Sequence, residues 1–185
     1  MKQKLVILRG APASGKTTIC KKLRNIEENI VWLSVDQIKP IFSDFKNETL
    51  ENANSACLVM LNYLLDHGYS VIYDGIFKNP AHVKQAEDVA QKKHIPFVVY
   101  QLECSLKTLQ EREKTREGVK EGLWKPMGDD LVENLCKTIE ENPIEEAVKL
   151  DTENTSLDEC VEIIKRNFGL NRHLMLVFLP VLILL

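Results

Sequence analysis

The sequence predicts a three-layer α/β fold, in which a five-stranded parallel sheet lies between layers of helices. Short runs rich in Leu, Val and Ile alternate along the chain with longer stretches of helical periodicity, which is typical of a doubly wound sheet. The length of 185 residues suits one domain with a substantial core. Such sheets bind ligands beyond the carboxyl ends of their strands, so the residues there are the first candidates for chemistry.

In the first half of the chain, the β-rich runs and the helical stretches are easily separated. The longest helical stretch carries Ala53, Cys57, Leu61 and Leu64 at helical spacing, and Gly68 terminates it. The predicted strands are Lys4–Arg9, Ile30–Ser34 and Ser70–Asp74, and the predicted helices are Gly15–Ile26, Asp36–Phe42 and Glu48–Asp66.

In the second half, capping residues indicate where helices begin. Asn79 is a good N-cap and Pro80 suits a first helical turn, and Ser105 is the expected cap of the next helix. The segment Glu117–Asp129 contains three glycines and a proline, which predicts a mobile loop. The strands expected here are Phe97–Leu102 and Glu146–Leu150, and the helices are one that begins at Pro80, Ser105–Arg116, Leu131–Glu141 and Leu157–Phe168.

Composition excludes several classes of protein. A net charge of −3 and a pI near 5.9 argue against a broad basic surface for extended duplex nucleic acid, although a local basic groove remains compatible with them. The cysteines are odd in number and widely spaced, which disfavours a disulfide framework or zinc site and favours a reducing cytoplasmic setting. They are expected to be small apolar core residues: Cys20, Cys57, Cys104, Cys136 and Cys160.

The two ends of the chain differ in character. No signal peptide is expected before the first strand. Residues 1–169 are predicted to form the domain, and residues 170–185 an additional tail that ends in the apolar stretch Leu174–Leu185. This stretch contains Pro180 and is shorter than the roughly 20 residues that span a bilayer, so a membrane role is not favoured. The preferred alternatives are a segment that docks on the domain and a remnant without function.

The turn after the first strand carries the most specific motif. Residues 10–17 match GxxxxGK[ST], with a hydrophobic strand before the motif and a helix after it. In this pattern glycines allow backbone amides to point at phosphate oxygens, Lys16 reaches the β- and γ-phosphates, and the Thr17 hydroxyl ligates Mg²⁺. The alternative is a chance glycine-rich turn. The motif predicts binding of ATP with Mg²⁺ by Gly10, Ala11, Pro12, Ala13, Ser14, Gly15, Lys16, Thr17 and Thr18.

Two aspartates lie where strands are predicted to end. Asp36 follows the second strand, and Asp74 ends the third. A carboxylate near an acceptor hydroxyl can take its proton, so Asp36 is the candidate general base. Asp74 is a candidate contact to the metal or to the substrate. Lys39 lies on the helical face of Asp36 and could hold an anionic group of the substrate. Alternatively, Asp36 caps a helix, Asp74 ends a strand, and Lys39 is a solvated surface lysine.

Arg112 and Arg116 lie four residues apart, on one face of a helix that precedes the glycine-rich loop. An arginine that neutralises charge on a migrating phosphoryl group favours phosphate transfer, and a lid that carries it would exclude water. We therefore expect Arg116 to be catalytic and Arg112 to contact the nucleotide. The alternative is that both arginines belong to a solvent-exposed charged helix that also carries several glutamates.

Together these residues resemble the P-loop kinase group of small-molecule and polynucleotide kinases, often labelled ATP-binding (AAA-type). The resemblance covers about 2–168 and is strongest to the kinase domain of phage-type polynucleotide 5′-hydroxyl kinases, with chloramphenicol phosphotransferase and zeta-toxin kinases more distant. It implies the P-loop NTPase fold with strand order 2-3-1-4-5 and a monomer or homodimer. It also implies that Asp36 is the general base and that Arg116 contacts the transferring phosphate. In that family the residue matching Lys39 is an arginine that holds a 3′-phosphate, and lysine does not replace arginine at a bidentate contact.

The sequence therefore predicts an ATP-dependent kinase that phosphorylates a hydroxyl of a small molecule or of a nucleotide or polynucleotide end. A nucleoside-monophosphate kinase, whose acceptor is a phosphate, is the second hypothesis. A non-catalytic ATP-binding switch is the third.

Overall fold

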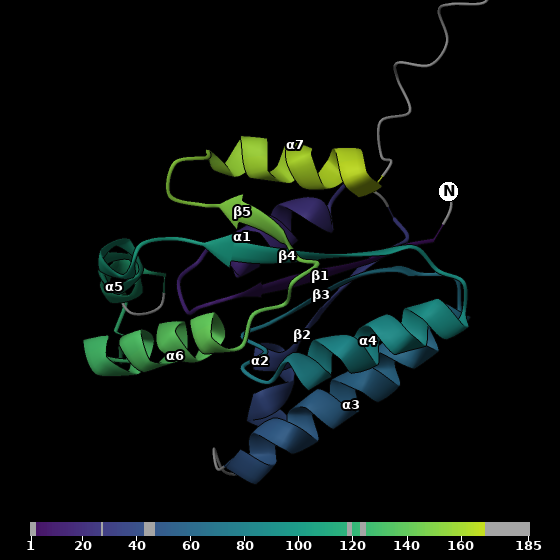
Figure 1. Ribbon diagram of the computed structural model, residues 1–185, viewed down its shortest axis with the longest axis horizontal. Coiled ribbons are helices and arrows are strands. Elements are labelled where there is room, and N and C mark those ends of the chain that lie inside the picture. Colours follow the sequence, from purple (N-terminus) through teal and green to yellow (C-terminus); the bar gives the residue numbers. More distant parts are fainter. Residues whose placement is uncertain (1–2, 27, 43–46, 118–119, 123–124, 169–185) are drawn as a thin grey trace, which may run out of the picture.

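The computed structural model describes residues 3–26, 28–42, 47–117, 120–122 and 125–168. Its five strands form one parallel sheet in the order β2-β3-β1-β4-β5 (Figure 1). The strands are β1 (Leu5–Gly10), β2 (Ile30–Ser34), β3 (Ser70–Gly75), β4 (Phe97–Glu103) and β5 (Val148–Asp151). The predicted α/β class and the implied strand order are confirmed.

Helices cover both faces of the sheet and one of its ends. In Figure 1, α1 and α7 lie on one face and α3 and α4 on the other, while α5 and α6 lie side by side beyond the ends of the strands. The helices are α1 (Lys16–Leu23), α2 (Val35–Ile38), the 3₁₀ turn η1 (Lys39–Ile41), α3 (Asn47–Asp66), α4 (Pro80–Lys92), α5 (Leu106–Thr115), α6 (Asp129–Glu141) and α7 (Leu157–Phe168).

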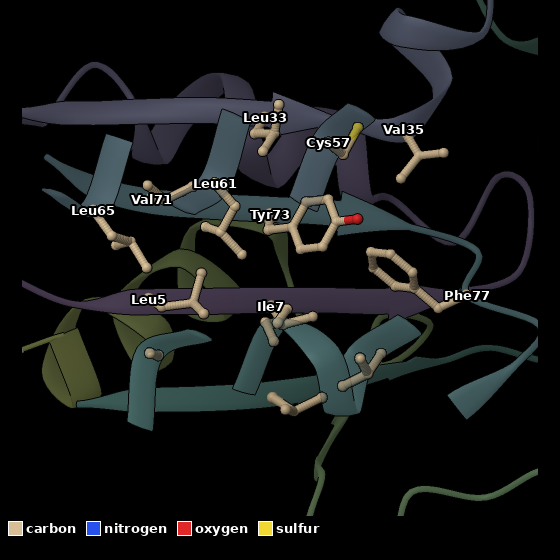
Figure 2. Packing of buried hydrophobic residues seen from close by; sticks show 14 of the residues in the cluster. Leu5, Ile7, Leu33, Val35, Cys57, Leu61, Leu65, Val71, Tyr73 and Phe77 are labelled. Carbon is tan, nitrogen blue, oxygen red and sulfur yellow. The ribbon is translucent and has the colours of Figure 1, made fainter. Parts of the chain in front are cut away.

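The central strand β1 shows why the sheet is buried on both faces. Leu5 and Ile7 pack in the cluster beneath α3 and α4, whereas Val6 and Leu8 pack on the opposite side with α1 and α7. Because successive side chains of a strand point to opposite faces, an uninterrupted apolar run suits a strand covered on both sides. Figure 2 shows Leu5 and Ile7 of β1 in the same cluster as Leu61 of α3.

The expected caps are present. The Asn79 side chain accepts a hydrogen bond from the Ala81 amide, and Ser105 Oγ accepts one from the Thr108 amide. These bonds satisfy amides that have no partner within the first helical turn. The predicted starts of α4 and α5 are therefore confirmed to within one residue.

One predicted helix is divided in the structure. Instead of a continuous helix over Asp36–Phe42, α2 ends at Ile38 and a 3₁₀ turn follows. Pro40 explains the break, because it lacks the amide hydrogen that would bond to the carbonyl four residues earlier. The break keeps Asp36 and Lys39 close to the end of β2.

The five cysteines are free. Three of them, Cys20, Cys57 and Cys160, are buried as expected, whereas Cys104 and Cys136 are only partly buried. Among the described residues, no helix is both long and apolar enough to cross a membrane. The predicted tail at 170–185 lies outside the described residues, as do positions 118–119 and 123–124 of the predicted loop.

Candidate active site

The phosphate loop connects the carboxyl end of β1 to α1. Its backbone takes left-handed conformations at Ala13, with φ of 59°, and at Gly15, with φ of 95°. Gly10 is required for space, because a Cβ there would lie 2.7 Å from Ser14 Oγ and 3.1 Å from the Leu102 Cβ. The sequence thus builds a tight turn whose following helix begins at Lys16, and helix N-termini favour anions.

Lys16 folds back over this loop. Its Nζ donates hydrogen bonds of 2.8 Å to the carbonyl oxygens of both Gly10 and Ala11, and the residue is only 6% exposed. Burial lowers the pKa of Lys16, and the negative charges of Asp74 and Asp36 oppose that effect. The ammonium therefore lies at the loop, ready to exchange carbonyl partners for phosphate oxygens.

Asp74 lies beneath the loop, in the sheet itself. It pairs in register with Leu8 of β1 and with Ser34 of β2, and it is 1% exposed. Trp32 Nε1 donates a hydrogen bond of 2.6 Å to Asp74 Oδ1. Burial raises the pKa of Asp74, while hydrogen bonds from Trp32 and Ser34 and the charge of Lys16 partly offset the rise. A buried carboxylate near the P-loop lysine is suited to a cation contact.

Replacing Trp32 by phenylalanine should show how much this donor contributes. A smaller phenyl ring replaces the indole and the N–H bond to the carboxylate is lost, so the free energy of unfolding should fall by about 1.5–3 kcal/mol at neutral pH. Burial holds the folded pKa of Asp74 above its unfolded value, so ionisation of this carboxyl disfavours folding as pH rises. The variant loses a donor that limits this penalty, so its deficit should be larger at pH 7 than at pH 4.

Urea unfolding at the two pH values measures this difference. The Trp32 ring centroid also lies 5.6 Å from the Arg24 guanidinium carbon, and any loss of this contact should be the same at both pH values, so that it cancels in the comparison. An equal deficit at both pH values would show that the Trp32 bond does not act on the ionised form of Asp74.

A cleft of about 1040 Å³ opens above the loop. Pro12 to Thr18 form its floor, and Asp36 of α2 and the two arginines of the α5 end, Arg112 and Arg116, line its walls. The structure therefore brings together residues that are more than 90 positions apart in the sequence. Of the predicted site residues, Gly10, Ala11, Lys39 and Asp74 do not line this cleft.

Asp36 and Lys39 form an ion pair on one side of the cleft, with Lys39 Nζ donating to Asp36 Oδ1. Burial acts to raise the pKa of Asp36, but the positive charges of Lys39, Lys16 and Arg116 outweigh it and lower the pKa. The Asp36 side chain is 53% exposed, so a ligand can reach it. Lys39 holds a carboxylate in the structure, and its contact with substrate stays a prediction.

The two arginines have different partners. Arg112 Nη2 donates a hydrogen bond of 2.9 Å to the carbonyl oxygen of Thr152, which links α5 to the segment after β5. Arg116, where α5 ends, contacts Glu113 Oε1 at 3.1 Å through Nη2 and is 36% exposed at its side chain. Both arginines therefore line the cleft, and each is held by one contact: Arg112 by the Thr152 carbonyl and Arg116 by the Glu113 carboxylate.

The segment between β5 and α7 was missed by the sequence-based prediction of the site. It supplies Thr152, Glu153, Thr155 and Ser156 to the cleft wall, and Leu157 at the start of α7 follows them. The rule that placed Asp36 and Asp74 applies equally to this strand end, so the polar sequence after β5 was an available signal. Further lining residues are Ile76 and Met127.

The donor set fits a nucleotide with Mg²⁺. The loop offers backbone amides at a helix N-terminus, Lys16 offers an ammonium, and Thr17, which carries a hydroxyl, lines the cleft. Magnesium in proteins commonly takes few protein ligands and completes its shell with phosphate oxygens and water. Thr17 and Asp74 are the residues predicted to serve it.

Solved structures with this fold include kinases. The protein APE1195 matches with a TM-score of 0.71 and 21% identity over 91% of this chain and 96% of that chain. The Mycobacterium tuberculosis APS kinase in complex with AMPPNP and APS gives a TM-score of 0.66 and 17% identity, covering 91% and 98%. A chain of the Pnkp1/Rnl/Hen1 RNA repair complex gives a TM-score of 0.60 and 20% identity, covering 76% of this chain and 45% of that chain.

These likenesses show the fold that the resemblance to P-loop kinases implied. The sequence matches no curated protein significantly. The family model described as Zeta toxin matches residues 1–166, which is most of the domain. The chain therefore belongs to the Zeta toxin family.

Proposed function

We propose that this protein is an ATP-dependent kinase that transfers the γ-phosphate of ATP to a hydroxyl group of a small molecule or of a nucleotide or polynucleotide end. One observation carries the proposal: the P-loop, the carboxylate of Asp36 and the guanidinium of Arg116 line a single cleft. A nucleotide-binding switch needs only the P-loop, whereas phosphate transfer also uses a base such as Asp36 and a cation such as Arg116.

The phosphate loop holds and orients the nucleotide. Its amides and Lys16 would neutralise the phosphates, and Thr17 and Asp74 would hold the divalent cation, which would shield charge that develops on the phosphate oxygens. Thr18 lines the cleft next to the loop. The link between Arg112 and Thr152 supports a nucleotide-binding role for Arg112, since it joins two walls of the cleft.

Asp36 faces the same cleft from α2 and serves the acceptor. It accepts the proton of the acceptor hydroxyl while the new bond from oxygen to phosphorus forms and the bond to the ADP leaving group breaks. The lowered pKa keeps Asp36 ionised at neutral pH, which is the form a base requires. Lys39 supports this role by pairing with the carboxylate.

Arg116 serves the migrating phosphoryl group. It lies close enough to Asp36 for its charge to lower the pKa of that carboxyl. A guanidinium that lines the same cleft as the base and the phosphate loop can stabilise charge on the equatorial oxygens during transfer.

A screen with γ-labelled ATP and Mg²⁺ tests the proposal. Its acceptors are nucleosides, 5′-hydroxyl oligonucleotides, nucleotide sugars and small alcohols, with nucleoside monophosphates as a separate arm. We expect label to move to at least one hydroxyl acceptor, and Asp36→Asn to slow that transfer by about 10²–10⁴-fold. Nucleotide binding with slow hydrolysis, and no labelled product from any acceptor, would contradict a kinase. Label on a monophosphate alone would indicate a phosphate acceptor instead.

A further inference from the structure

Glu113 is a buried carboxylate that the proposed mechanism does not use. It lies in α5 and is 2% exposed, while its neighbours along the outer side of that helix are charged and exposed. Taking a carboxylate out of water costs free energy unless hydrogen bonds or opposite charges compensate. A buried glutamate close to a proposed catalytic arginine therefore needs an explanation.

One oxygen of Glu113 has two partners from different parts of the chain. Oε1 accepts a hydrogen bond of 3.1 Å from the backbone amide of Met127, and it contacts Arg116 Nη2 at 3.1 Å. Arg116 and Met127 both line the cleft, whereas Glu113 does not. Glu113 thus holds two residues that line the cleft, Arg116 and Met127, without lining it itself.

The ion pair between Glu113 and Arg116 involves only one oxygen of the carboxylate and one nitrogen of the guanidinium. Glu113 Oε2 and Arg116 Nε are buried and have no hydrogen-bond partner among the described residues. The contact through Nη2 restrains the guanidinium at one edge, and the Arg116 side chain, which lines the cleft, remains 36% exposed. A guanidinium carries five donors, so one anchored nitrogen leaves others available to a ligand.

We propose that Glu113 is a positioning residue, which holds the Arg116 guanidinium in the cleft so that it meets the transferring phosphate without reorganisation. The inference rests on the proposed function. A preorganised charge stabilises a transition state better than one that must first be ordered, and a long arginine side chain loses considerable rotamer freedom when it is held. Glu113 removes that ordering step by its contact with Nη2.

The test is a double-mutant cycle in the best acceptor assay. Glu113→Gln keeps the volume and an acceptor for the Met127 amide, but it removes the charge that holds Arg116. We expect kcat to fall on the order of 10-fold, with the KM for ATP within about 2-fold, because the restraint matters mainly in the transition state. In the Arg116→Ala background the same substitution should change kcat by less than about 2-fold.

Two variants of α5 serve as controls. Glu111→Gln removes the same charge from an exposed position of this helix. Lys114→Ala breaks the exposed Lys114–Asp129 ion pair of 2.7 Å, which joins α5 to α6 but does not involve Arg116. Both should leave kcat within about 2-fold, as expected for exposed charges.

The outcomes separate the inference from the function on which it rests. Equal losses from Glu113→Gln in both backgrounds would overturn positioning through Arg116, because the residue would then act independently. A normal kcat for Glu113→Gln together with a lowered kcat for Arg116→Ala would also overturn positioning through Arg116. A normal kcat for Arg116→Ala itself would overturn the role of Arg116 in the proposed function, and the inference with it.

Discussion

Replacing Asp36 by asparagine should lower kcat by about 10²–10⁴-fold, because asparagine cannot accept the proton of an acceptor hydroxyl. Its amide oxygen can still accept a hydrogen bond from Lys39, and the side chain is largely exposed, so the fold and the nucleotide site should change little. We therefore expect the Kd for ATP to stay within about 3-fold, since no lost contact involves the phosphate loop. Single-turnover transfer and equilibrium nucleotide binding measure the two quantities separately.

Asp88→Asn is a matched control for this substitution. Asp88 is an exposed aspartate of α4, paired with Lys84 at 3.3 Å and outside the cleft. Its replacement should leave both kcat and Kd near those of the wild type. If Asp36→Asn transferred phosphate at a nearly normal rate, Asp36 would not be the base. A mild effect combined with acceleration of ADP formation by nucleoside monophosphates would point to a phosphate acceptor.

Replacing Lys16 by alanine should lower kcat/KM by about 10²–10³-fold, because the loop would lose the ammonium that neutralises charge on the transferred phosphate. ATP with Mg²⁺ should also raise Tm much less than in the wild type, since at a given concentration a ligand stabilises the native state less as its Kd rises. The measurements are steady-state kinetics and thermal unfolding with and without nucleotide.

Lys22→Ala is the corresponding control on the same helix. Lys22 is exposed, forms an ion pair with Asp158 of α7, and does not line the cleft. It should change neither kinetics nor the nucleotide-induced shift in Tm by more than a small amount. A full shift in Tm for Lys16→Ala would contradict the assignment of the P-loop lysine. A lower Tm without nucleotide would measure separately what the two carbonyl contacts of Lys16 contribute to the loop.

Much of the fold was predictable because local and long-range preferences agree. The run Leu5–Leu8 is apolar on both sides and is covered on both sides by helices, as an inner parallel strand must be. Asn79 and Ser105 fixed the starts of two helices because capping depends on the residue itself and its near neighbours. The P-loop was recognisable for the same reason, since its glycines are needed by a turn that the chain makes locally.

The rest of the site depends on contacts that no local pattern encodes. The link from Arg112 to the Thr152 carbonyl joins positions 40 residues apart, and it exists because β5 is an edge strand next to β4. The burial of Glu113 depends on the backbone of Met127, whereas the surrounding sequence is typical of an exposed charged helix. The division between α2 and η1 was signalled by Pro40 but was not anticipated.

The two carbonyl contacts of Lys16 have a consequence for turnover. Without nucleotide the ammonium has oxygen partners at 2.8 Å on the loop itself, so phosphate binding is an exchange of partners and not the capture of a bare charge. The free energy that Lys16 contributes to phosphate binding is then the difference between its bonds to phosphate and its bonds to the two carbonyls. This difference is smaller than the contribution of either set of bonds alone. When ADP departs, the loop carbonyls can take the ammonium back as the phosphate oxygens leave. An exchange of this kind favours rapid release of product. Binding is then tightest in the transition state, when extra charge develops on the migrating phosphoryl group.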